Sequence, residues 1–127
     1  MSNTEAIGLE EQAVKLPGWK WAPRTRTVEG WSVLLATLNL VTLWHPNCPY
    51  YTLPPSDVAE LCGGLDLSDP ATGGILFSML GEGWIAENDG ISYSVYNHAV
   101  IGVFCYKHFA EACVRAAIAL GGWPEAP

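Results

Sequence analysis

Residues 65–80 carry the feature that most constrains how this chain can fold, a helix start with its flanking signals intact. Asp69 can cap the free N–H groups of a helix, and Pro70 suits the first helical position, where no N–H is needed. Apolar residues then recur at the spacing of one buried helix face: Ile75, Leu76, Met79 and Leu80. The pattern predicts a helix over residues 69–80, with Asp69 as its cap and not as a catalyst.

The predicted helix contains the pair Gly73-Gly74, which is unusual inside a helix. Each glycine costs about 1 kcal/mol relative to alanine, because it loses more backbone freedom on folding. The close approach of another backbone would explain why glycine stands here.

The N-terminal half predicts a short helix followed by β-structure. Residues 4–16 form an amphipathic pattern with Ile7, Ala13 and Val14 inward, and it ends at a Pro-Gly pair. Residues 31–44 fit either a β-hairpin or a helix, and their β-branched and aromatic content favours strands. Residues 45–55 contain four prolines and are expected to be a loop. Residues 56–62 fit a turn of helix.

The C-terminal half predicts three strands and a helix. The strands are expected at 83–88, 91–96 and 99–106, because residues 88–90 (Asn-Asp-Gly) are a strong hairpin turn. A helix over 108–120 follows, with an inward stripe of Phe109, Cys113, Ala116, Ala117 and Leu120. We therefore expect one α+β domain over residues 1–127, an antiparallel sheet (hairpin plus three-stranded meander) with two to three helices packed on one face.

The charges separate a basic N-terminal region from an acidic body. Four of the six Lys and Arg residues fall between positions 15 and 26, none lies between 27 and 106, and the net charge is −7. So few cations argue against general nucleic-acid binding, which depends on phosphate contacts. The acidic body either attracts a basic protein surface or only keeps a hydrophobic chain in solution. In the first case we expect the contact residues to be Asp57, Glu60, Asp66 and Glu87.

The four cysteines form no Cys-x-x-Cys pair, and no secretory signal precedes them. We therefore expect free, mostly buried thiols and a cytoplasmic location. The apolar stretch 31–44 is too short to span a bilayer as a helix, so no membrane association is expected.

Three segments together resemble a family of small uncharacterised proteins encoded by tailed bacteriophages and prophages. They are residues 17–21 (PGWKW), residues 65–73 (LDLSDPATG) and the alanine-rich residues 110–120. Family members carry a PGWxW start, an LPDLxDPATxG helix start and an EALxxAL ending. This chain has Gly64-Leu65 where the pattern has Leu-Pro, and residues 31–55 have no counterpart. The resemblance implies a phage setting in the host cytoplasm, where small accessory proteins often bind and modulate host machinery. It implies no activity.

Two Cys/His pairs offer the best case for an enzyme: His45 with Cys48, and Cys105 with His108. A thiolate nucleophile needs a base close in space. Cys105, however, is expected to be a packed core thiol, and no Gly-rich oxyanion loop is present. We expect no enzymatic activity, and a Cys-dependent enzyme led by Cys105 stays a remote alternative.

A metal site built from His45, Cys48 and Cys62 lacks the tight ligand pairs that structural zinc sites present. Phosphate-binding glycine motifs are also absent. We therefore expect neither a metal nor a cofactor.

The best binding feature is a group of aromatic and cationic side chains. Its members lie in an extended segment or in the proline-rich region: Trp19, Trp21, Arg24, Arg26, Trp44, Tyr50 and Tyr51. Aromatic faces with Arg can hold a planar or anionic ligand, and the same residue types dominate protein interfaces. Alternatively, Trp19 and Trp21 pack on the core while the arginines are solvated.

Two functions are therefore expected. The first is a non-enzymatic phage protein that binds and inhibits a host protein, for instance a host-defence component. The second is a module that sequesters a nucleotide-like small molecule. The high hydrophobic fraction and six Trp are compatible with a homodimer.

Overall fold

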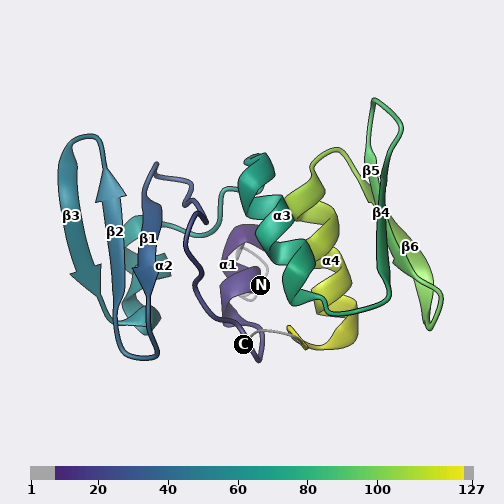
Figure 1. Ribbon diagram of the computed structural model, residues 1–127, viewed down its shortest axis with the longest axis horizontal. Helices are drawn as coiled ribbons and strands as arrows, with labels where there is room; N and C mark the ends of the chain where they lie inside the picture. Colours follow the sequence, from purple (N-terminus) through teal and green to yellow (C-terminus); the bar gives the residue numbers. More distant parts are fainter. Residues whose placement is uncertain (1–7, 125–127) are drawn as a thin grey trace, which may run out of the picture.

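The computed structural model describes residues 8–124, which form two three-stranded antiparallel sheets and four helices (Figure 1). The sheets lie at the two ends of the molecule, and helices stand between them. The elements in chain order are α1 (Leu9–Lys15), β1 (Ser32–Ala36), β2 (Val41–His45), β3 (Cys48–Leu53), α2 (Pro55–Cys62), α3 (Pro70–Met79), β4 (Trp84–Asn88), β5 (Tyr93–Asn97), β6 (Val100–Tyr106) and α4 (Phe109–Leu120). The α+β class is confirmed, but the strands form two sheets and not one.

The first sheet is a meander in the order β1-β2-β3. Antiparallel pairing of β1 with β2 shows that residues 31–44 form a hairpin and not a helix. The predicted loop over residues 45–55 is wrong, because β3 pairs with β2 from Leu53 to Cys48. β3 is an edge strand, where one side of the backbone needs no ladder partner and proline is tolerated.

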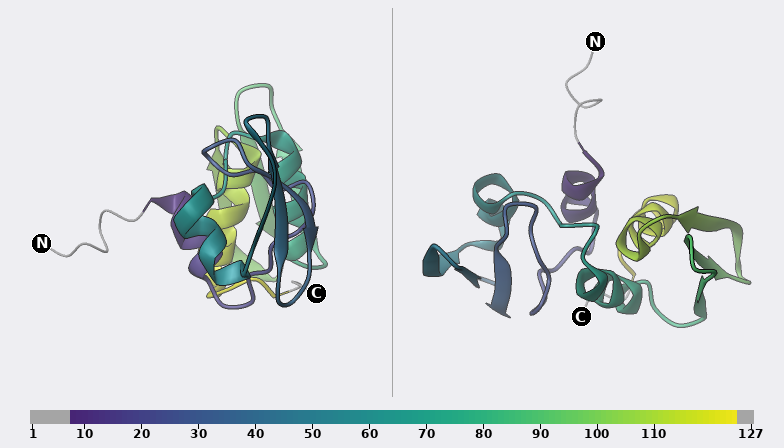
Figure 2. Two further views of the ribbon diagram at one scale, coloured as in Figure 1. Left: turned by 90° about the vertical axis from the view of Figure 1, so that its left-hand side faces the viewer. Right: turned by 90° about the horizontal axis from the view of Figure 1, so that it is seen from above.

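One side of this sheet is buried. Val33, Val41 and Leu43 are at most 2% exposed. The short helix α2 covers that side of the sheet (Figure 2), and its Val58 and Cys62 are fully buried. The opposite side faces away from the helices, so apolar residues that point there stay in solvent.

The second sheet, in the order β4-β5-β6, confirms the three strands predicted from the sequence. In its first turn, the Asp89 carboxylate accepts hydrogen bonds from the N–H groups of Ile91 and Ser92, each at 2.8 Å. Gly90 has φ = 92°, the left-handed conformation that the Asp-Gly signal indicated.

Helix α3 begins as predicted. Asp69 Oδ2 accepts hydrogen bonds from the backbone N–H of Thr72 (3.2 Å) and from its hydroxyl (2.8 Å). The Thr72 hydroxyl oxygen in turn accepts the N–H of Arg26 at 3.0 Å. The helix cap therefore also fixes the chain segment that precedes β1.

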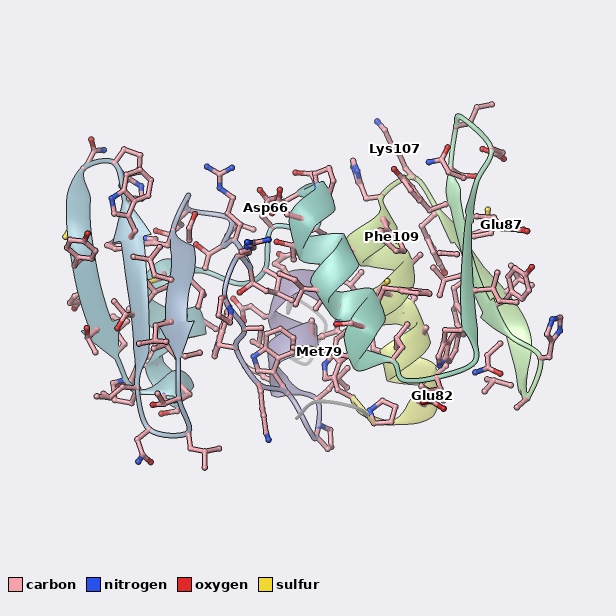
Figure 3. The ribbon with its side chains drawn as sticks, viewed as in Figure 1. Asp66, Met79, Glu82, Glu87, Lys107 and Phe109 are labelled. Atoms are coloured by element: carbon pink, nitrogen blue, oxygen red, sulfur yellow. The ribbon has the colours of Figure 1, made fainter. Side chains whose placement is uncertain are left out.

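Helix α4 lies between α3 and the second sheet, so it is buried on two sides. This explains why its buried set is broader than the predicted stripe: Ala110, Ala112, Cys113, Val114, Ala116 and Ala117. Leu120, predicted inward, is 37% exposed in the last turn. Phe109 projects toward the second sheet (Figure 3) and stacks on Tyr93 with ring centroids 5.2 Å apart.

Residues 16–31, which we call the connecting segment, run from α1 to β1 between the helices and the first sheet. Backbone hydrogen bonds fix it to both sides: Arg24 N–H to Val33 O (2.8 Å), Val28 N–H to Gly64 O (2.9 Å) and Trp123 N–H to Pro17 O (2.8 Å). In α1, Ala13 is buried and Val14 is half-buried as predicted, and the predicted start at residues 4–7 lies outside the described residues.

Candidate functional site

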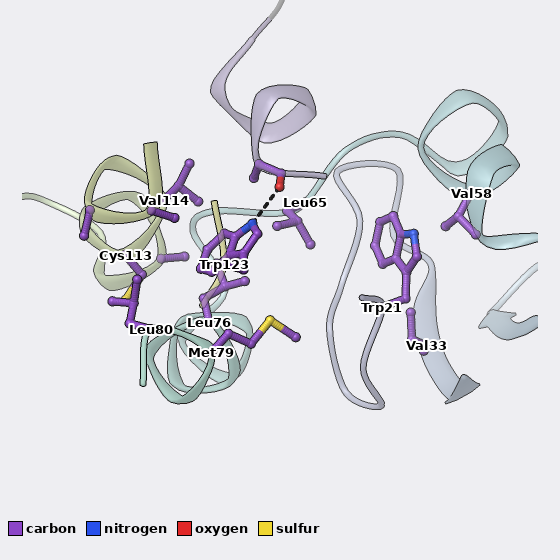
Figure 4. Packing of buried hydrophobic residues seen from close by; sticks show 14 of the residues in the cluster. Trp21, Val33, Val58, Leu65, Leu76, Met79, Leu80, Cys113, Val114 and Trp123 are labelled. Carbon is purple, nitrogen blue, oxygen red and sulfur yellow. Dashed lines mark hydrogen bonds between the residues drawn. The ribbon is translucent and has the colours of Figure 1, made fainter. Parts of the chain in front are cut away.

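Trp19 and Trp21 are held rigidly in the connecting segment. Their rings meet edge to face, with centroids 5.3 Å apart and planes at 84°. The Trp21 indole N–H donates to the carbonyl oxygen of Pro55 at 3.2 Å. Trp19 also packs against Trp123, at 5.6 Å between centroids, and Trp123 donates its indole N–H to Ala13 O at 2.9 Å (Figure 4). Both predicted binding tryptophans therefore have fixed positions.

Both rings line a cleft of about 740 Å³, which we call the tryptophan cleft. The cleft lies between the first sheet and α3, and Figure 4 shows Met79 of α3 extending toward the segment that carries Trp21. Its walls come from five parts of the chain: Val14, Trp19, Lys20, Trp21, Ala22, Pro23, Ala36, Thr37, Leu38, Val41, Pro55, Ser56, Ile75, Ser78 and Met79. Small-molecule sites span about 300–1,000 Å³, so the cleft has the size of one.

The walls of the tryptophan cleft are mainly apolar. Leu38, on the β1–β2 turn, lines it and is 81% exposed. The hydroxyls of Thr37 and Ser78 already donate to backbone carbonyl oxygens, at 3.2 and 2.6 Å. Among the described residues that line the cleft, Lys20 is the only charged one. The cleft therefore offers an apolar body and one cation.

One wall residue has an unsatisfied polar atom. The indole N–H of Trp19 is buried and has no hydrogen-bond acceptor within residues 8–124. An unsatisfied buried donor costs about 1–3 kcal/mol. Protein atoms cover this N–H, so it does not reach the cleft in its present position.

The two predicted arginines lie outside the cleft walls. Arg26 is exposed between the buried residues Thr25 and Thr27, as alternation along an extended chain predicts. Arg24 is exposed in a turn that the Thr25 N–H closes by donating to Ala22 O at 3.2 Å. Arg24 also has φ = 77°, a left-handed conformation that few residues other than glycine adopt. The structure thus separates the arginines from Trp19.

The three aromatic residues of the first sheet lie on two different sides of it. Leu43 and Tyr51 are paired on the buried side, so their neighbours Trp44 and Tyr50 face outward. Trp44 is 38% exposed and Tyr50 is 70% exposed. Tyr51 packs against Trp31 instead, with ring centroids 5.7 Å apart. None of the three lines the tryptophan cleft.

The four predicted acidic contact residues are also dispersed. Asp57 and Glu60 lie on α2, while Glu87 lies on β4 at the other end of the molecule (Figures 1 and 3). Asp66 lies near the start of α3, where its carboxylate accepts both the N–H (3.1 Å) and the hydroxyl (2.6 Å) of Ser68. The four residues therefore do not form one continuous surface.

Cys105 is not the packed core thiol that the sequence predicted. It lies exposed on β6, with its Sγ 3.3 Å from the hydroxyl oxygen of Ser92. Hydrogen bonds from Ser92 and Ser94 lower the pKa of Cys105. His108 instead occupies the N-cap position of α4. The structure therefore pairs this thiol with serines.

The other candidate pair, His45 and Cys48, lies face to face at the β2–β3 turn, but each side chain makes its hydrogen bonds to backbone groups. The Cys48 thiol is directed at the carbonyl of Tyr50 (3.9 Å), and the ring nitrogens of His45 interact with backbone groups of Glu29 and Asn47. Cys62 is buried, and burial raises its pKa to about 11. Within residues 8–124, no three His, Cys, Asp or Glu side chains gather closely enough to hold a metal ion.

Sequence reasoning missed most of the cleft walls. Lys20 stands between the two predicted tryptophans in the sequence, and this position could have predicted that it belongs to the same site. No local sequence pattern predicts that the cleft walls include Leu38, Pro55 and Met79, because tertiary packing brings these residues together.

Within residues 8–124, no helix has the length and apolar character needed to span a bilayer. Comparison of the chain with protein-family models, with curated proteins and with solved structures finds no match.

Proposed function

We propose that the protein is a non-enzymatic binding module that captures an amphipathic small molecule in the tryptophan cleft. The observation that carries this proposal is a cleft of about 740 Å³ with two fixed indole rings and a solvent-exposed Leu38 in its walls. Contiguous exposed apolar surface, such as these cleft walls, marks ligand-binding grooves. Aromatic walls provide contact area with little loss of side-chain freedom.

The walls suit capture better than catalysis. They contain no His, Cys, Asp or Glu among the described residues, so no imidazole, carboxylate or thiol lines the cleft. In the phage setting that the sequence resemblance implies, the protein would withdraw its ligand from the host cytoplasm.

Blocking the cleft tests this proposal. Ser78 is exposed on α3 and lines the cleft, so Ser78→Phe would fill it. Ala71 is exposed on the same helix outside the cleft walls, so Ala71→Phe is a matched control. The neutral fluorescent probe N-phenyl-1-naphthylamine should bind the wild type and Ala71→Phe with one site, and bind Ser78→Phe at least tenfold more weakly. Equal binding by all three proteins would refute the cleft as the site.

A second candidate function is inhibition of a host protein through the outer side of the first sheet. The observation that favours it is a group of exposed apolar residues on β1, β2 and β3: Leu34, Leu35, Trp44 and Tyr50. Trp and Tyr dominate the energetics of protein interfaces, and a group of exposed apolar residues is a common mark of one.

This second function predicts a partner that depends on the sheet. Leu35 is 59% exposed, so Leu35→Glu leaves the core intact. A host protein captured in stoichiometric amount by tagged wild type and lost with Leu35→Glu would support the inhibitor function. Retention of that protein by Leu35→Glu would exclude this side of the sheet as the contact.

A further inference from the structure

The charge of the tryptophan cleft points to a class of ligand. Lys20 is the only charged residue among the described residues that line it, although the chain carries 13 Asp and Glu. A lone cation at an apolar cleft is best matched by one negative charge on an otherwise apolar molecule.

The number of charges is limited as well. A ligand with several phosphate charges would find one lysine in the cleft and a protein of net charge −7 around it. Repulsion by the whole protein would then oppose binding. Arg24 and Arg26, which could have added charge, lie outside the cleft walls.

We propose that the ligand of the tryptophan cleft is a monoanionic aromatic molecule, such as an aromatic carboxylate, and that Lys20 pairs with its anionic group. The ring system lies against Trp19, Trp21 and the apolar walls, where the two indoles provide flat contact surfaces. This inference rests on the proposed small-molecule function and narrows it to one ligand class.

Three matched probes test the inference by isothermal titration calorimetry: naphthalene-2-acetate, its neutral amide, and the cationic 2-(2-naphthyl)ethylamine. The anion should bind about fivefold more tightly than the amide, because a partly exposed ion pair lowers the dissociation constant by a factor of about five. The cation should bind most weakly. Added salt should weaken binding of the anion and leave the amide unaffected.

Variants assign the preference to one residue. Lys20 is exposed, so Lys20→Met keeps the fold and should bring the anion and the amide to equal affinity. Lys107→Met is the matched control, because Lys107 is also exposed and lies outside the cleft walls, and it should keep the fivefold ratio.

Failure of this inference is distinguishable from failure of the proposed function. If the amide binds as tightly as the anion, or if Lys20→Met keeps the ratio, the ligand class is wrong while the cleft remains a binding site. If none of the three probes and no neutral fluorophore binds, the proposed function itself is refuted.

Discussion

Alanine substitutions at Gly73 and Gly74 of α3 probe how closely this helix approaches α4. The two glycines are adjacent, but their surroundings differ. A Cβ at Gly73 would lie 3.0 Å from the backbone nitrogen of Ala110 and 3.0 Å from the ring of Phe109. A Cβ at Gly74 would meet no atom within 4 Å.

The expected magnitudes follow from these distances. Either alanine gains about 1 kcal/mol of helix propensity. At Gly74 nothing opposes this gain, so Gly74→Ala should raise the free energy of unfolding by about 1 kcal/mol. At Gly73 the methyl group overpacks the helix interface, which costs about 1–3 kcal/mol. The variant should therefore be unchanged or destabilised by up to about 2 kcal/mol.

Urea and thermal unfolding, followed by circular dichroism, measure both variants against the wild type. A chain of this length shifts its melting temperature by about 4 °C per kcal/mol. The melting temperature of Gly74→Ala should thus exceed that of Gly73→Ala by roughly 4–12 °C. Equal stabilisation by both alanines would mean that α3 and α4 are not in close backbone contact, and the reasoning would be refuted.

Three further predictions concern single side chains. Cys105 is exposed and its hydrogen bonds lower its pKa, whereas burial raises the pKa of Cys113 to about 12. Peptide mass spectrometry should therefore find that iodoacetamide alkylates Cys105 in the folded protein and Cys113 only after unfolding. The reverse order of alkylation would contradict the structure. Asp69→Ala removes the α3 cap and should lower the free energy of unfolding in urea by about 1 kcal/mol, so an unchanged value would argue against the cap. Backbone hydrogen bonds from Ser92 and Ile91 lower the pKa of Asp89 in the folded protein below its usual value of 3.8. The stability that this carboxylate provides is therefore fully present above the pKa of the unfolded state, and it is lost as the pH falls through the pKa of the folded state. The stability difference between wild type and Asp89→Ala should accordingly be constant near neutral pH and shrink in acid, and a difference that grew in acid would contradict this.

Local signals in the sequence predict much of the fold. Asp69 and Pro70 specify the start of α3 because capping depends on residues only three positions apart. The Asn-Asp-Gly turn specifies the β4–β5 hairpin because few other residues adopt positive φ. β3 escapes prediction because proline excludes a strand only where both sides of the backbone need partners, and edge position is a tertiary property.

The tryptophan cleft depends on contacts that no local pattern reveals. Trp19 contacts Trp123, and Trp21 donates to Pro55, so each ring is held by a residue far along the chain. The predicted cluster with Arg24 assumed that neighbours in sequence share a site. A turn over residues 22–25, with Arg24 at φ = 77°, leaves this arginine exposed and outside the cleft walls.

Nuclear magnetic resonance of the six indole N–H groups shows which tryptophans a ligand contacts when it binds. Protein labelled with nitrogen-15 would be titrated with naphthalene-2-acetate, with each signal assigned by a Trp→Phe variant. Binding in the cleft predicts that the signals of Trp19 and Trp21 move with saturable shifts, while those of Trp44 on the outer side of the first sheet and Trp84 in the second sheet stay in place. Shifts confined to Trp44, or no shift of any indole signal, would contradict a ligand site in the tryptophan cleft.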